Sequence, residues 1–132
     1  MKPEISIITI GVDDLERAFA FYRALFDLDD GQIGAGEDHV AFFFADGFSF
    51  VLFPRAEIAR TAGAPEAVAG TPGFVLSHRA DNEAAVDAIV DRVLIAGGSI
   101  ITPGTQSEWG YSAYFADSEG NVWEVMATPP VN

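Results

Sequence analysis

Residues 111–125 read YSAYFADSEGNVWEV, a pattern typical of two strands joined by a tight turn. Aromatic and apolar side chains predominate on both sides of Asp117–Gly120, whose aspartate, serine and glycine are common turn residues. The pattern therefore predicts strands over Tyr111–Ala116 and Asn121–Met126, with Asp117–Gly120 as the connection.

The same arrangement occurs earlier in the chain. The β-branched run within Glu4–Ile10 predicts a strand. Apolar residues spaced by three and four over Leu15–Phe26 predict an amphipathic helix. Two further strands are predicted at about His39–Ala45 and Phe48–Phe53, joined by a turn at Asp46–Gly47.

The second half of the chain has this order of elements as well. Gly73–His78 reads as a strand, and a helix is expected to begin at Asp81–Glu83. It ends at Gly97–Gly98, because glycine is common just after the last helical turn. A strand over Ser99–Thr102 then precedes the hairpin. Strand, helix and two or three strands thus occur twice, which predicts an α+β fold of two βαβββ modules.

We expect the two modules to form one domain, residues 1–132, from about residues 3–54 and 73–128. The linker, residues 55–72, is rich in Ala, Gly and Pro and is expected to contain a short helix over Glu57–Thr61. Each module is too small to bury its sheet alone. Curved mixed sheets around a shared cavity are therefore expected, and a concave space of this kind is where a small ligand would bind.

The chain is strongly acidic and has no cysteine. Its 132 residues include 20 Asp+Glu and 7 Lys+Arg, a formal charge of −13. This balance repels phosphate backbones and anionic lipids, so neither nucleic acid nor a membrane is an expected partner. No apolar run reaches the roughly 20 residues of a membrane span, and the first residues lack a signal-peptide pattern. We expect a cytoplasmic protein whose partner is a small-molecule ligand.

Residues Ile5–Tyr22, ISIITIGVDDLERAFAFY, together with Tyr111–Val125, resemble the vicinal oxygen chelate superfamily. This group contains the glyoxalases I, bleomycin-resistance proteins and extradiol dioxygenases. The strongest part of the resemblance is the pattern aromatic–x–Asp–x–x–Gly–Asn–x–x–Glu, present as Phe115, Asp117, Gly120, Asn121 and Glu124. The resemblance implies the paired βαβββ fold over nearly the whole chain, but no single activity, because the superfamily supports several chemistries on one scaffold.

The resemblance also implies where a metal ion would bind. Metal-dependent members place ligands at an early residue of each module's first strand and at a residue of each last strand. The first-strand positions fall at Ile7 and, with an offset of 67 between the modules, at Phe74, and the last-strand positions at Val51 and Glu124. Only Glu124 is a metal-binding residue, whereas such sites need three or four N or O donors. We therefore expect neither a metal ion nor another cofactor.

Glu124 and His78 are the candidate catalytic residues. Glu124 can be a general base or metal ligand in the cavity, or a structural residue that orients a ligand. His78 is expected on the same strand face as Phe74, either bonded to backbone or near the cavity. An altered metal site built from His78, Glu124 and His39 is left open as an alternative.

The side chains expected to contact a ligand are mostly apolar or aromatic. Trp109, in a loop before the last hairpin, is the candidate lid over the cavity. The candidate ligand-binding residues are Ile7, Thr9, Phe50, Val51, Phe74, Leu76, Trp109 and Tyr111. For the aromatic residues, packing in the core or a dimer interface is the alternative.

Two functions remain open at this point. The first is a metal-independent protein that binds an apolar or aromatic small molecule. The second is a metal-dependent glyoxalase-like lyase or dioxygenase with an altered metal site, in which Glu124 is base or ligand. A homodimer is expected in both cases, because pairing would cover exposed strand edges and phenylalanine side chains.

Overall fold

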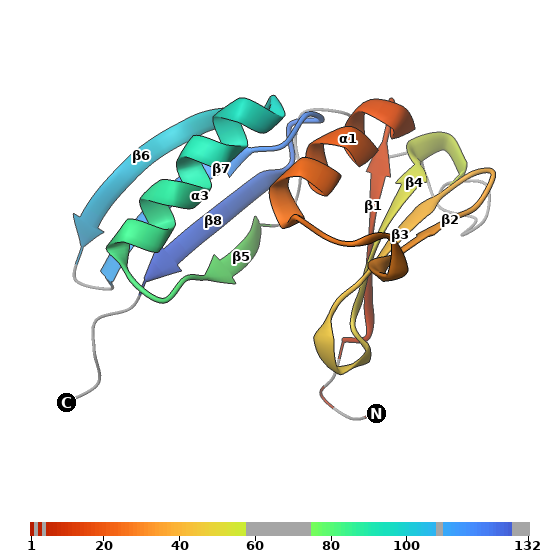
Figure 1. Cartoon of the computed structure of the whole chain (residues 1–132), viewed down its shortest axis with the longest axis horizontal. Helices are drawn as coiled ribbons and strands as arrows, with labels where there is room; N and C mark the ends of the chain where they lie inside the picture. Colours follow the sequence, from red (N-terminus) through yellow and green to blue (C-terminus); the bar gives the residue numbers. More distant parts are fainter. Residues whose placement is uncertain (2, 4, 58–74, 108–109, 128–132) are drawn as a thin grey trace. The chain divides into compact units, whose positions relative to one another are not determined.

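The computed structural model describes the chain except for residues 2, 4, 58–74, 108–109 and 128–132. It consists of two compact units, Met1–Val68 and Ala69–Asn132. Each unit is a four-stranded mixed sheet with a helix packed on one face (Figure 1). This confirms the α+β class and the repeated order of strand, helix and strands.

The first unit has the sheet order β1-β4-β3-β2. Strand β1 is parallel to β4, and the other neighbours are antiparallel. The elements are β1 (Ile7–Val12), α1 (Leu15–Phe26), η1 (Asp30–Gln32), β2 (Ile33–Ala35), β3 (Val40–Phe43), η2 (Ala45–Gly47) and β4 (Ser49–Pro54).

Helix α1 is held by its own caps and by an aromatic core. The Asp14 side chain accepts a hydrogen bond from the Arg17 backbone N–H at 3.0 Å, which satisfies one of the free donors of the first turn. Tyr22 is fully buried, and its ring centroid lies 4.9 Å from that of Phe50 in β4. Phe42 in β3 is also fully buried. One face of this sheet therefore forms a buried apolar core with α1.

The second unit repeats this topology with the order β5-β8-β7-β6. Strand β5 is parallel to β8, and the remaining pairs are antiparallel. Its elements are β5 (Val75–Arg79), α3 (Glu83–Ala96), β6 (Ser99–Ser107), β7 (Gly110–Ala116) and β8 (Val122–Ala127).

Helix α3, the only helix among the described residues of this unit, packs on one face of the second sheet (Figure 1). Val86 and Val93 of α3 are fully buried, as are Ala113 of β7 and Val125 of β8. Because side chains alternate along a strand, Glu124 lies on the opposite face from Val125. We call the side of the second sheet opposite α3 its open face.

Several strand ends differ from the prediction by one to three residues, as in β1, which covers Ile7–Val12 instead of Glu4–Ile10, and two differences are larger. The short strand β2, which pairs with β3, was not among the predicted segments. Strand β6 continues to Ser107 instead of ending at Thr102, and its pairing with β7 shifts register between Ile100 and Thr102 and again before Thr105. These shifts let the strand continue past Pro103.

Other predictions concern residues that the structure does not describe or the arrangement of the two modules. The short helix predicted over Glu57–Thr61 lies, apart from Glu57, outside the described residues. The arrangement of both modules as one domain around a shared cavity stays a prediction. In the part of the chain that the structure describes, no helix is long and apolar enough to cross a membrane.

Candidate functional site

The turn between β7 and β8 is shaped by the aspartate of the terminal motif. Asp117 is 5% exposed, and its Oδ1 accepts hydrogen bonds from the backbone N–H groups of Glu119 and Asn121, both at 2.8 Å. Its Oδ2 accepts a bond from the Asn121 side-chain amide at 2.9 Å. Gly120 has a φ of 86°, which glycine adopts without strain. These motif residues therefore build the turn, and Glu124 is the one that faces outward on the open face.

Glu124 is the centre of a row of polar side chains that crosses three strands. It is paired with Ser77 of β5 on one side and with Tyr114 of β7 on the other. The Ser77 hydroxyl donates to Oε1 of Glu124 at 2.9 Å, and the Tyr114 hydroxyl donates to Oε2 at 2.8 Å. Each carboxylate oxygen thus accepts one hydroxyl hydrogen bond and keeps lone pairs for a further donor.

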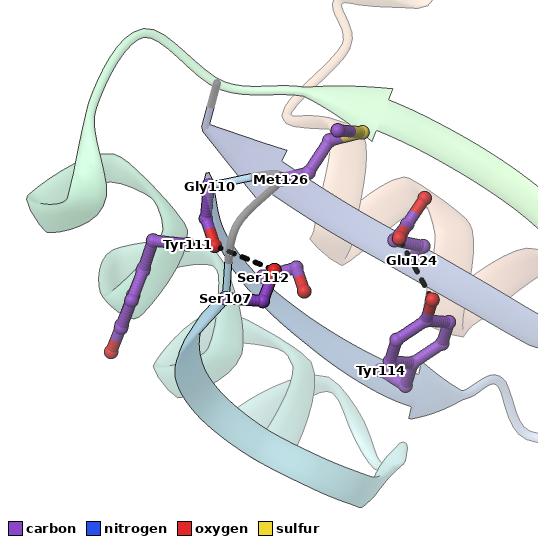
Figure 2. A pocket seen from close by; sticks show the side chains of 7 residues that line it. All are labelled: Ser107, Gly110, Tyr111, Ser112, Tyr114, Glu124 and Met126. Atoms are coloured by element: carbon purple, nitrogen blue, oxygen red, sulfur yellow. Dashed lines mark hydrogen bonds between the residues drawn. The ribbon is translucent and has the colours of Figure 1, made fainter. Parts of the chain in front are cut away.

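A pocket of about 420 Å³ lies beside this row (Figure 2). Ser112 and Met126, which are paired one row along from Tyr114 and Glu124, contribute to its wall. The lining residues come from β6, β7 and β8 and are Ser107, Gly110, Tyr111, Ser112, Tyr114, Glu124 and Met126. The pocket combines one carboxylate, several hydroxyls and an apolar thioether, and its size is that of a small-molecule site.

The hydrogen bond to Glu124 has a consequence for Tyr114. It raises the pKa of Tyr114 above the ordinary value of 10.0, with smaller contributions from burial and from the negative charge of Glu124. The phenol therefore keeps its proton at neutral pH and acts as a donor to the carboxylate.

Tyr111 is directed away from this group. Figure 2 shows its side chain pointing away from Glu124 and Tyr114, and its hydroxyl donates to Oδ1 of Asp87 in α3 at 2.7 Å. That hydrogen bond is the main reason why the pKa of Tyr111 is raised above 10.0. The Tyr111 ring passes so close to Gly104 of β6 that a Cβ atom there would collide with it. Tyr111 borders the pocket, but its hydroxyl is hydrogen-bonded to helix α3 and does not point into the pocket.

The two histidines belong to different units, and the structure places only His78 relative to Glu124. His78 is paired with Val125 and so belongs to the α3 face of the second sheet, opposite Glu124. His39 lies in the first unit, where its Nδ1 is 2.8 Å from Oδ1 of Asp38. The structure therefore contradicts a site shared by His78 and Glu124, because a residue one position from Ser77 lies on the other face of β5.

Strand pairing corrects the offset between the two modules. Ile7 is paired with Ser49, two residues before Val51, and Val75 is paired with Val122, two residues before Glu124. Val75, not Phe74, is therefore the counterpart of Ile7, and the offset is 68 instead of 67. The helices agree, since Asp14 caps α1 and Asn82 caps α3. Phe74 itself lies outside the described residues.

The remaining candidate ligand-binding residues fall on different faces. Phe50 is 1% exposed in the core against α1, and Leu76 is paired with Trp123 on the α3 face. Thr9 and Val51 are paired with each other on the face of the first sheet away from α1. Ile7, which is 59% exposed, shares that face. Trp109 lies outside the described residues.

The pocket also includes residues that were not among the candidates. Tyr114 can be found from the sequence by counting outward from the Asp117–Gly120 turn, because hairpin pairing places it opposite Glu124. Met126 follows from strand alternation two residues after Glu124. Ser77 cannot be found in this way, since it joins the row only through the pairing of β5 with β8.

The residues at the metal-ligand positions do not fit a metal ion. They are Ile7, Val51, Val75 and Glu124, which together provide one carboxylate. Among the residues that the structure describes, no three His, Cys, Asp or Glu side chains are grouped to hold an ion. A divalent metal needs three or four N or O donors from the protein at such a site. We therefore derive no chemistry through a metal at these positions.

Comparison with known proteins agrees with the fold. The model of the glyoxalase/bleomycin resistance protein/dioxygenase superfamily matches residues 4–125. The chain belongs to this superfamily. No curated protein matches its sequence.

Solved structures of the superfamily share the fold at low sequence identity. A glyoxalase-related enzyme from Fulvimarina pelagi is 25% identical, with a TM-score of 0.84 over 98% of this chain and 93% of that one. A lactoylglutathione lyase from Agrobacterium tumefaciens is also 25% identical, with a TM-score of 0.70 over 95% and 93% of the two chains. A superfamily enzyme from Burkholderia phytofirmans is 19% identical, with a TM-score of 0.81 over 94% and 98%. At 19% identity, the Burkholderia phytofirmans enzyme shows similarity of fold alone.

Proposed function

We propose that the chain is a metal-independent small-molecule-binding member of the superfamily, with its ligand in the pocket beside Glu124. The observation that carries this proposal is the carboxylate of Glu124, oriented by Ser77 and Tyr114 at the wall of a pocket of about 420 Å³. Met126 and the Tyr114 ring supply apolar surface for an aromatic or apolar ligand.

The residues at the four metal-ligand positions support binding of a ligand without a metal ion. Three of the four positions that hold ligands in metal-dependent members are aliphatic in this chain. Of the four, only Glu124 can coordinate, and its two oxygens already accept hydrogen bonds from Ser77 and Tyr114. Orientation of a carboxylate by two hydroxyls is the arrangement expected of a group that recognises a ligand directly.

The second candidate function is a glyoxalase-like lyase or dioxygenase with an altered metal site. The lactoylglutathione lyase structure, 25% identical to this chain, favours it, as does the presence of Glu124 at a metal-ligand position. In this alternative Glu124 is a metal ligand or a general base.

Two measurements on protein purified without chelator separate these functions. Under our proposal, metal analysis finds no stoichiometric Ni, Zn, Fe or Mn, and added metal does not raise the melting temperature. Native mass spectrometry then finds an organic molecule retained by the chain or taken up from a compound mixture. A stoichiometric metal whose loss accompanies Glu124→Ala would favour the enzyme instead.

We also propose that the protein is a homodimer located in the cytoplasm. The support for the dimer is the exposure of large apolar side chains away from the helices, with Ile7 59% and Val75 50% exposed. Light scattering at micromolar concentration tests it, and the mass of a single chain would contradict it.

A further inference from the structure

We propose that Asp46–Gly47 is a site of backbone modification, at which aspartate converts to isoaspartate through a succinimide ring. The proposal goes beyond the binding function proposed above and does not depend on it. The dipeptide Asp–Gly occurs twice in the chain, at residues 30–31 and 46–47. The inference comes from the different surroundings that the structure gives to these two identical dipeptides.

The reaction needs only the chain and water. The backbone nitrogen of Gly47 attacks Cγ of Asp46, and the new N–Cγ bond closes a five-membered ring. The N–H proton leaves with the hydroxyl of the carboxyl group as one water molecule. Water then opens the ring: attack at Cγ restores aspartate, whereas attack at the backbone carbonyl carbon breaks its bond to nitrogen and gives isoaspartate. Glycine favours the first step because it has no side chain to hinder the attacking nitrogen.

The turn at Asp46 already has part of the geometry that ring closure needs. Asp46 has a φ of 62° and a ψ of 28°, and Gly47 has a φ of 75°. The Phe48 N–H donates to the Ala45 carbonyl at 3.3 Å and closes the turn. These angles are close to those of a type I′ turn, about 60° and 30° followed by a φ of about 90°. A positive φ is uncommon outside glycine, and aspartate tolerates it better than most residues.

Rotation of one peptide group completes this geometry. At a ψ of 28° the Gly47 nitrogen points away from the Asp46 side chain. A type II′ turn keeps the φ of its first central residue near 60° and changes ψ to about −120°, which brings the nitrogen beside Cβ and within reach of Cγ. Glycine accepts both orientations of the peptide group without strain. Beyond the adjoining residues, no described atom lies within 4 Å of the position that a Gly47 Cβ would occupy, so there is room for the rotation.

The Asp46 carboxyl is also free to move, whereas that of Asp30 is held. Asp46 and Gly47 are both exposed, and no described residue forms a hydrogen bond or an ion pair with the Asp46 side chain. The Asp30 carboxylate accepts a hydrogen bond from the Arg23 guanidinium at 2.8 Å. This charge-assisted hydrogen bond holds the Asp30 side chain in place and occupies one of its oxygens. We therefore expect Asp46, and not Asp30, to react in the folded chain.

Isoaspartate in this turn affects the end of the aromatic core. The turn is flanked by Phe44 and Phe48, whose ring centroids lie 5.9 Å apart. The Phe44 ring also lies 5.1 Å from that of Phe26 in α1, and the Phe44 N–H donates to the Phe48 carbonyl at 2.8 Å. The isoaspartyl link adds one atom to the main chain and displaces these rings from one another. We therefore expect the modified chain to melt at a lower temperature than the unmodified chain.

The test is incubation of the native chain at physiological temperature and neutral pH over several weeks. Trypsin and a glutamyl endopeptidase cut after Arg23, Glu37 and Arg55, so the two Asp–Gly dipeptides fall in separate peptides. Aspartyl and isoaspartyl peptides have equal mass but differ in chromatographic retention and in electron-transfer fragments. We expect isoaspartate to accumulate about ten-fold faster at residue 46 than at residue 30, a difference of about 1.4 kcal/mol in activation free energy. Equal rates, a faster reaction at residue 30, or no isoaspartate at either residue would overturn the proposal.

The chain unfolded in guanidinium chloride is the control for the flanking sequence. Without the fold, the two dipeptides are expected to react at rates within about two-fold of each other, because each aspartate is followed by an unhindered glycine. If the preference for residue 46 is just as large in the unfolded chain, the neighbouring residues cause it and the role of the fold is refuted.

Three variants separate the contributions of the side chains. Arg23→Gln releases Asp30 and is expected to raise the rate at residue 30 several-fold without changing the rate at residue 46. Arg92→Gln, which removes the same charge from the exposed surface of α3, is the matched control and is expected to change neither rate. An unchanged rate at residue 30 in Arg23→Gln would refute protection by the ion pair. Asp46→Glu keeps the charge but cannot form the five-membered ring, so its melting temperature should not fall during incubation. An equal fall in Asp46→Glu and the native chain would show that other damage causes it.

Discussion

Asp117 should stabilise the second unit through the turn that it builds, and this can be measured. Asp117→Ala removes the acceptor for the N–H groups of Glu119 and Asn121 and for the Asn121 side-chain amide. Asn121 is 8% exposed, so its two donors lose their partner away from water. A buried donor left without a partner costs about 1–3 kcal/mol, and the more exposed Glu119 N–H can bind water. We expect Asp117→Ala to lower the free energy of unfolding by about 3 kcal/mol.

Asp117→Asn is the matched variant. Its amide oxygen can still accept the two backbone hydrogen bonds, but its NH₂ group would face the Asn121 amide and lose the third. We expect a loss of about 1–1.5 kcal/mol, from one missing hydrogen bond and a weaker neutral acceptor.

Urea unfolding followed by tryptophan fluorescence is the assay, because Trp109 and Trp123 both belong to the second unit. A loss below about 1 kcal/mol for Asp117→Ala would refute the reasoning, since one buried unpaired donor alone costs that much. Equal losses for the two variants would refute the assignment of the backbone hydrogen bonds to the Asp117 side chain.

Three further predictions concern packing and protonation. Gly104→Ala is expected to cost about 1–3 kcal/mol in urea unfolding, because its Cβ would collide with Tyr111, whereas Gly31→Ala, where the Cβ position is less crowded, should cost less. Phe50→Ala is expected to lower the free energy of unfolding by about 3–5 kcal/mol, and a loss below about 1 kcal/mol would contradict its place in the α1 core. Tyr114 and Tyr111 are expected to ionise above pH 10.0 in a phenolate absorbance titration. Because their pKa is raised on folding, the stability from these hydrogen bonds is complete below pH 10.0 and is lost as pH rises through the folded-state pKa. In Glu124→Gln the pKa of Tyr114 should return toward 10.0, and an unchanged Tyr114 titration would contradict the assigned hydrogen bond.

Local signals in the sequence were sufficient to predict the helix starts and turns that are stabilised by hydrogen bonds between neighbouring residues. Asp14 and Asn82 each accept a hydrogen bond from a backbone N–H three residues later, so the helix starts depend on neighbouring residues alone. The turn at Asp117 likewise depends on hydrogen bonds between residues that are close in the sequence. Strand β6 was predicted too short because Pro103 and Gly104 are locally unfavourable in strands, and pairing with β7 overrides that preference.

The open face of the second sheet could be predicted only in part. Tyr114 lies opposite Glu124 through a hairpin whose register follows from the adjacent turn. The offset of 67 was wrong by one residue, and such an error moves every strand residue to the opposite face of the sheet. That is why Phe74 and His78 were expected near Glu124, whereas Ser77 is its neighbour.

The sequence alone was enough to assign the superfamily, through the resemblance of its terminal motif, and the repeated α+β topology. The topology depends on local capping and turn chemistry and on hydrophobic spacing. The tertiary structure was needed to assemble Ser77, Tyr114 and Glu124. Ser77 and Glu124 are 47 residues apart, and they meet because β5 hydrogen-bonds beside β8. Pairing between distant strands is selected by burial of a whole sheet face against α3, and no short stretch of sequence contains that information.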